Sequence, residues 1–135
     1  MSLKIGEEWQ SIAERLIEKF NVAFSHIEID KVLFLSENEK KPKKYADIKF
    51  IGYPFNFITE YKYVIVFYEN NTQVMTDAQR VMLVFHELLQ IDYSFDKIRK
   101  YNIKDFRELI SFAGVNWDID PNLPNILDDD IDGPI

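Results

Sequence analysis

The spacing of apolar residues along the chain predicts an alternation of helices and strands. Between Gly6 and Phe24 they recur every three or four residues, with charged residues on the other positions, which predicts an amphipathic helix over 6–24. The segment Tyr61–Tyr68 (YKYVIVFY) is rich in β-branched and aromatic residues and predicts the clearest strand. Shorter apolar patterns predict two further strands, over 31–36 and 45–51.

The second half of the chain carries recognisable helix signals. After a predicted turn at 69–71, Thr76 can cap a helix over 76–91, and Gln79 stands three residues later, as a capping box requires. A third helix is predicted over 102–113, with Asn102 as its cap. The predicted fold class is α+β. A three-stranded sheet packs against an N-terminal helix, a central helix and a C-terminal helix.

Charge divides the chain into a nearly neutral body and an acidic end. The net charge is −7, and the segment from Val115 onwards contains six aspartates but no lysine or arginine. We therefore expect one domain over 1–120 and an irregular acidic tail over 121–135. A balance of this kind does not attract phosphate backbones, so we expect no nucleic-acid partner.

The same composition bounds the cellular setting. There is no cysteine, which excludes disulfides, thiolate zinc sites and cysteine nucleophiles. The sequence contains no run of eighteen apolar residues, which a membrane span would require, and its N-terminus does not resemble a secretory signal. We therefore expect a cytoplasmic protein without a membrane partner.

One short motif carries possible chemistry. The predicted helix 76–91 contains His86-Glu87-Leu88-Leu89-Gln90. In the zincin pattern His-Glu-x-x-His, histidines four residues apart lie one helical turn apart and reach the same metal. The intervening glutamate then takes a proton from the metal-bound water. Here the first histidine and the glutamate are present, and Gln90 occupies the second ligand position. We expect His86 and Gln90 to share one helix face, in a groove beside the strand 61–68.

The order of segments from about Tyr45 to Trp117 resembles the zincin-like phage metallopeptidase family. The carrying segments are YKYVIVFYE, then TDAQRVMLVFHELLQI, then RKYNIKDFRELISFAGVNW. The resemblance implies a zincin-like fold, a zinc ion and a Glu87 general base. It also implies a downstream histidine ligand, where this chain has Tyr101 followed by Asn102 in place of aspartate.

The expected ligand set is therefore depleted. Catalytic zinc normally takes three protein ligands, and a glutamine carbonyl or a protonated tyrosine phenol is a poor substitute. Of the implied metal ligands only His86 is retained, and the chain's other histidine, His26, reads as a boundary or interface residue. Substitute carboxylates nearby in sequence are Asp92, Asp96 and Asp105.

Two functions from different classes follow. In the first, the protein is a catalytically inactive metallopeptidase homologue with no resident cofactor, which binds a peptide or protein partner in the old substrate cleft. In the second, it is an active metal-dependent peptidase or hydrolase, with zinc held by an altered ligand set and Glu87 as the base. The missing histidines favour the first.

Overall fold

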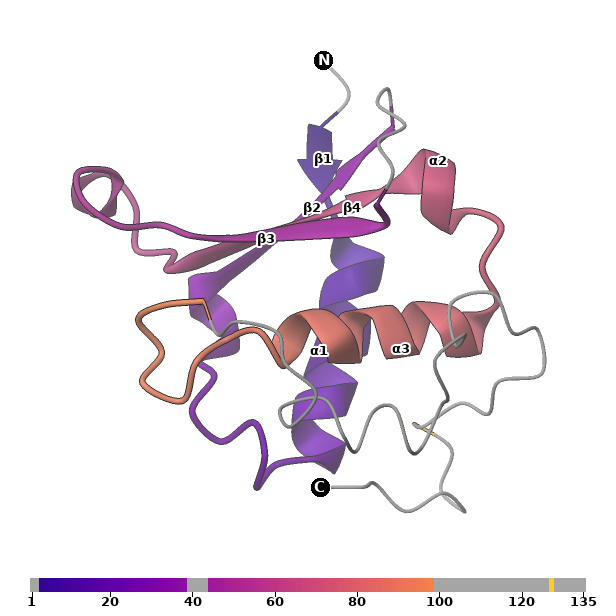
Figure 1. The fold of residues 1–135 in the computed structure, drawn as a ribbon, viewed down its shortest axis with the longest axis horizontal. Helices are drawn as coiled ribbons and strands as arrows, with labels where there is room; N and C mark the ends of the chain where they lie inside the picture. Colours follow the sequence, from indigo (N-terminus) through magenta and orange to yellow (C-terminus); the bar gives the residue numbers. More distant parts are fainter. Residues whose placement is uncertain (1–2, 39–43, 99–126, 128–135) are drawn as a thin grey trace.

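A mixed four-stranded sheet organises the part of the chain that the computed structural model describes, residues 3–38, 44–98 and 127. The strands lie in the order β1–β2–β4–β3 (Figure 1). Central strands β2 and β4 run parallel, and each is flanked by an antiparallel edge strand. Their bounds are β1 Leu3–Ile5, β2 Val32–Glu37, β3 Ala46–Phe50 and β4 Tyr63–Tyr68.

The three predicted strands are present, but the three-stranded sheet is wrong. The additional strand β1 pairs with β2 in the register Leu3↔Glu37 and Ile5↔Leu35. Three residues give no period-two pattern that a sequence argument can recognise, so this strand is defined only by its partner.

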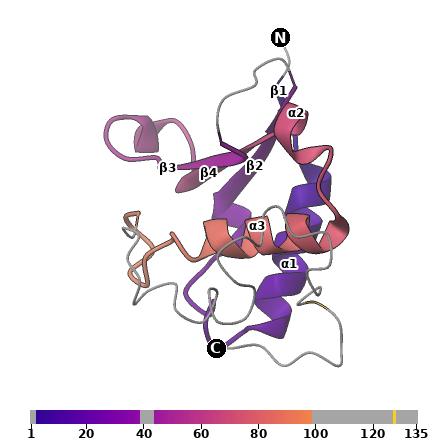
Figure 2. The ribbon, with the colours of Figure 1, turned by 45° about the vertical axis from the view of Figure 1, so that its right-hand side comes forward.

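Two helices cover one face of the sheet and cross each other (Figures 1 and 2). They are α1, Glu7–Lys19, and α3, Asp77–Leu88. The predicted turn at 69–71 is a short helix instead, α2, Glu69–Thr72. Of the described helices, none has the length and apolar character needed to cross a membrane.

Helix α1 ends at Lys19, earlier than the predicted limit at Phe24. The chain turns at Phe20 and still keeps Phe20 and Phe24 in the core. The rings of Phe20 and Phe24 both meet the ring of Phe85 edge to face, at centroid distances of 5.3 and 5.5 Å. Packing, rather than helical periodicity, therefore positions these two rings.

The core lies between the sheet and the two long helices. Alternate residues of β4, namely Tyr63, Ile65 and Phe67, are fully buried, as a half-covered strand requires. Trp9 of α1 stacks on Phe67 with ring centroids 4.2 Å apart. From the predicted tail, Leu127 is partly buried against this core. The predicted helix over 102–113 and the rest of the tail lie outside the described residues.

Candidate functional site

Helix α3, which carries the His-Glu pair, begins at a complete capping box. The backbone N–H of Gln79 donates to the Thr76 hydroxyl at 3.2 Å, and the Gln79 side chain accepts from the Thr76 N–H at 2.8 Å. Two of the unpaired N–H groups at the helix start are thus satisfied, as the sequence predicts. This cap fixes where the helix begins and hence which residues reach its far end.

The far end of α3 lies under the sheet edge formed by β3. The helix packs against β3, whereas β4 is an interior strand. The strand that contacts α3 is therefore β3, because strand order is not specified by the sequence. The groove that we expect beside the strand 61–68 stays a prediction. Glu87 is 4% exposed and Gln90 is 8% exposed, while His86 is half-buried and its Nδ1 atom is buried.

The last turn of the helix is tighter than the zincin spacing assumes. The α-helix ends at Leu88, not near Ile91, and the N–H of Gln90 donates to the carbonyl of Glu87 at 3.1 Å. This three-residue bond is of the 3₁₀ type. The Gln90 side chain also bonds to the residue three positions earlier: its amide nitrogen donates to the Glu87 carboxylate. The residue at the second ligand position therefore engages the neighbouring glutamate.

The environment of Glu87 favours its neutral form. The pKa of this carboxyl is raised from 4.5 to about 7, chiefly by burial and next by the negative charge of Asp47. The positive charge of Lys44 and the hydrogen bond from Gln90 act in the opposite direction. Glu87 therefore exchanges its proton near neutral pH, a property shared by many general bases and by some structural carboxyls.

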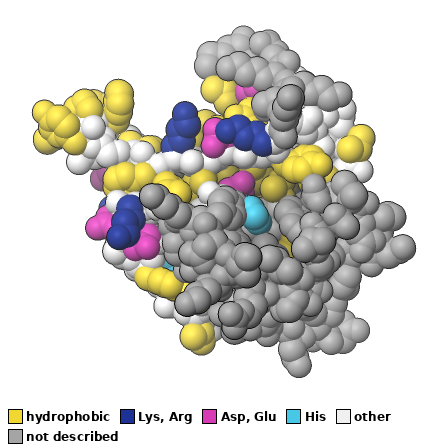
Figure 3. Space-filling model, viewed as in Figure 1, with side chains coloured by type: hydrophobic (Ala, Val, Ile, Leu, Met, Phe, Trp, Pro, Cys, Tyr) yellow, Lys and Arg dark blue, Asp and Glu magenta, His cyan; other side chains and the backbone are white. Residues whose placement is uncertain are grey.

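Two charged residues of β3 and its approach belong to this electrostatic site, and sequence reasoning missed both. Lys44 and Asp47 form an ion pair at 2.9 Å, and both act on the charge of Glu87. Figure 3 shows basic and acidic side chains close together along this edge of the sheet. The available signal was the lysine-rich segment before β3, which is typical of a solvated loop.

The residues described here do not fit a three-ligand zinc centre. Within residues 3–38, 44–98 and 127, no group of three histidine, aspartate or glutamate side chains is placed to hold a metal ion. The Gln90 amide nitrogen donates to Glu87, and its amide oxygen is a weak, neutral zinc ligand. The predicted positions Tyr101, Asn102 and Asp105 lie outside the described residues.

The other sequence candidates serve the loop that follows α3. His26 Nε2 lies 3.2 Å from the carbonyl oxygen of Ile91, and its ring lies 4.9 Å from that of Tyr93. Asp92 and Asp96 both accept hydrogen bonds from the Ser94 hydroxyl. His26 thus joins the end of the first helical region to the loop, and the two aspartates close a local turn.

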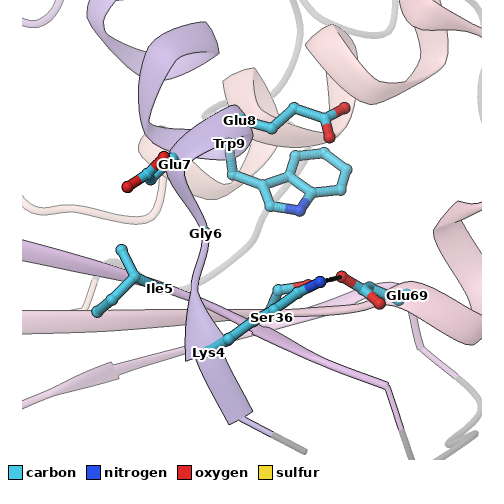
Figure 4. Close-up of a pocket in the computed structure, with 8 residues that line it drawn as sticks. All are labelled: Lys4, Ile5, Gly6, Glu7, Glu8, Trp9, Ser36 and Glu69. Carbon is cyan, nitrogen blue, oxygen red and sulfur yellow. Dashed lines mark hydrogen bonds and ion pairs between the residues drawn. The ribbon is translucent and has the colours of Figure 1, made fainter.

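A polar pocket of about 230 Å³ lies at the opposite end of the sheet order, beside β1 (Figure 4). The Glu69 carboxylate accepts from the Ser36 hydroxyl at 2.6 Å and pairs with the Lys4 ammonium at 3.0 Å. These contacts lower the pKa of Glu69, the Ser36 bond first. These contacts therefore link β1, β2 and α2 to one another, and the pocket does not present a set of reactive groups.

One comparison with known proteins gives a match. The family model described as "Putative phage metallopeptidase" matches residues 2–122, which is most of the chain. No curated protein and no solved structure matches the chain.

Proposed function

The chain belongs to the phage metallopeptidase family, and from that premise we propose that it is a catalytically inactive, zincin-like member that binds an extended peptide or protein segment. In this proposal the scaffold and the peptide-binding surface are those of the family. The residues of this chain determine whether the ancestral chemistry can operate there. Peptide binding is thus retained, and peptide hydrolysis is lost.

The bond from Gln90 to Glu87 is the observation that carries the loss of hydrolysis. A general base needs a free carboxylate oxygen directed at the water it deprotonates. Here a side-chain amide donates to the Glu87 carboxylate, and the carboxyl is buried and driven towards its neutral form. A metal ion, when bound in this family, would supply water activation. His86 alone offers a good zinc ligand among the motif residues described.

The position of β3 at the end of the strand order, and its hydrogen-bond pattern, support the binding half of the proposal. The Tyr45 carbonyl accepts from the Tyr68 N–H, and the Ile51 N–H donates to the Lys62 carbonyl. In an antiparallel pair, alternate residues turn their backbone groups to the other side. Ala46, Ile48 and Phe50 therefore direct N–H and C=O groups away from β4, where an extended peptide can add as a further strand.

Zinc titration and cleavage assays test the inactive assignment. Calorimetry on protein purified without a His-tag or chelator is expected to show no tight one-to-one zinc binding, and a peptide library is expected to remain uncut. The paired change Gln90→His with Tyr101→His is expected to introduce zinc binding. Zinc binding to the wild type at one equivalent, with cleavage that Glu87→Gln abolishes, would overturn the assignment.

A matched pair of variants tests the edge strand. Phe50→Pro removes an outward-facing N–H that makes no bond to β4, whereas Phe50→Ala removes the same side chain and keeps the N–H. A peptide selected from a displayed library by wild-type protein is expected to bind Phe50→Ala and to lose affinity for Phe50→Pro. Equal binding to both variants would place the peptide elsewhere.

The second candidate function is an active metal-dependent hydrolase with an altered ligand set and Glu87 as base. The observation that favours it is the raised pKa of Glu87, about 7, which suits a general base at neutral pH. The cleavage assay distinguishes the candidates, because only this one predicts activity that depends on Glu87.

A further inference from the structure

The hairpin that joins β3 to β4 ends in an exposed apolar tip, residues 51–60. It projects from the body of the molecule and forms an apolar protrusion in the space-filling view (Figures 1 and 3). The exposed fractions of its four largest apolar side chains are between 62% and 82%, at Tyr53, Phe55, Phe57 and Ile58. Apolar groups gathered in this way on a surface indicate an interaction site.

Charge changes sharply between the tip and its base. No charged residue occurs from Phe50 to Thr59, and lysines occur at the base, as Lys31, Lys49 and Lys62, with one glutamate, Glu60. Half-exposed aromatic residues, Phe50 and Tyr61, mark the boundary between the two zones. From the tip of the hairpin to its base, the exposed side chains are thus first apolar, then aromatic, then basic.

A hollow of about 500 Å³ lies between the tip and the base. Its charged lining is Lys31, Lys62 and Glu60, and Tyr53 and Asn56 also line it. The Lys62 ammonium donates one hydrogen bond to the Phe95 carbonyl at 3.3 Å. An ammonium has three N–H donors, so the same group can donate to an anion in the hollow.

Two pockets on the described surface have polar linings that suit a second copy of this tip poorly. The pocket of Figure 4 is lined by Lys4, Glu7, Glu8 and Glu69 among others. A pocket between α1 and α3 is lined by Arg15, Asp77 and Arg80 among others. A convex apolar tip gains little from either pocket. Its apolar side chains would displace water from the charged residues there and give those residues no new partner.

We propose that the hairpin tip docks this protein onto an anionic lipid surface. Tyr53, Phe55, Phe57 and Ile58 enter the boundary between headgroups and acyl chains, where aromatic side chains concentrate. The lysines at the base meet the lipid phosphates. A peripheral contact of this kind needs no membrane-spanning helix. It differs from the sequence-based expectation of no membrane partner, which stays a prediction. It does not depend on the peptide-binding proposal.

Vesicle flotation with the full chain tests the proposal. Wild-type protein is expected to float with phosphatidylcholine vesicles that contain phosphatidylserine, and less with phosphatidylcholine alone. Phe57→Ser with Ile58→Ser is expected to weaken binding at least about tenfold. Lys49→Gln is expected to weaken binding to the anionic vesicles about fivefold, and added salt is expected to do the same. Matched controls are Val22→Ser and Val74→Ser, which change similarly exposed apolar residues on the body.

A spectroscopic readout separates lipid contact from other causes of flotation. Tyr53→Trp is expected to gain tryptophan fluorescence that brominated lipids quench, beyond any quenching of the wild type. Absence of flotation, equal flotation with both vesicle types, or flotation unchanged by the tip variants would overturn the proposal. So would self-association that the tip variants abolish in the absence of vesicle binding, because that result would assign the tip to a second copy.

Discussion

The side-chain amide of Gln90 donates a hydrogen bond to the carboxylate of Glu87, three residues earlier in the chain. In the zincin pattern these two positions hold a metal ligand and a general base. The ligand holds the metal that activates a water, and the base takes a proton from that water. Here the backbone tightens after Leu88 and directs one side chain onto the other. The contact satisfies a buried carboxyl that would otherwise need a charged or metal partner.

Glu87 should make the protein less stable as pH rises. Its pKa is about 7 in the folded state against an ordinary 4.5, so between these values the folded state holds more protons than the unfolded state. Stability from this group is complete below pH 4.5 and lost as pH passes 7. The contribution of Glu87 to the free energy of unfolding changes by about 3 kcal/mol between these two limits. Urea unfolding near pH 5 and near pH 8 measures it.

The matched variant for that measurement is Glu87→Gln, which keeps the shape and an acceptor oxygen for Gln90. It should unfold with little of this pH dependence, and near pH 8 it should be more stable than wild type. A variant with the wild-type pH dependence would show that another group is responsible.

Asp47 should raise the pKa of Glu87 through its negative charge. Asp47→Asn removes the like charge on β3 and should lower the Glu87 pKa, which carbon-detected NMR titration of the carboxyl can follow. Asp77→Asn, at the start of the same helix, should leave that pKa unchanged. An unaltered titration in Asp47→Asn would mean that β3 does not act on the site.

The capping box should contribute measurably to stability. Thr76→Ala removes the hydroxyl that accepts from the Gln79 N–H and should cost about 1 kcal/mol. Thr76→Ser retains the acceptor and should cost less. Chemical denaturation of the three proteins tests this, and equal losses in both variants would point to the threonine methyl group instead.

Tyr63 should hold the loop after α3 against the sheet. Its hydroxyl donates to the Lys97 carbonyl at 2.7 Å and accepts from the Lys97 N–H at 3.0 Å. Tyr63→Phe leaves two backbone groups without these bonds and should cost about 1–3 kcal/mol. Hydrogen exchange at the Lys97 amide should accelerate, whereas Tyr53→Phe in the exposed tip should leave that rate unchanged.

Several features could be predicted from the sequence because they depend on neighbouring residues. The strand predicted over 61–68 rests on a short-range enrichment in β-branched and aromatic residues, and it is observed as Tyr63–Tyr68. The capping box of Thr76 and Gln79 is a short-range pattern too. Both are confirmed. The family was also identifiable, since its motifs are linear segments in a fixed order. The C-terminal helix and the role of Tyr101 remain predictions.

The sequence by itself thus determined which residues form the main strands and helices, and that a glutamine replaces a histidine in the motif. Only the tertiary structure decided that β3, and not β4, lies at the sheet edge above α3. It also decided that Gln90 turns to Glu87 and that the apolar tip stays outside the core. The physical reason is that strand order and burial depend on pairings between residues far apart in the chain. Local periodicity is the same whichever partner a segment finds.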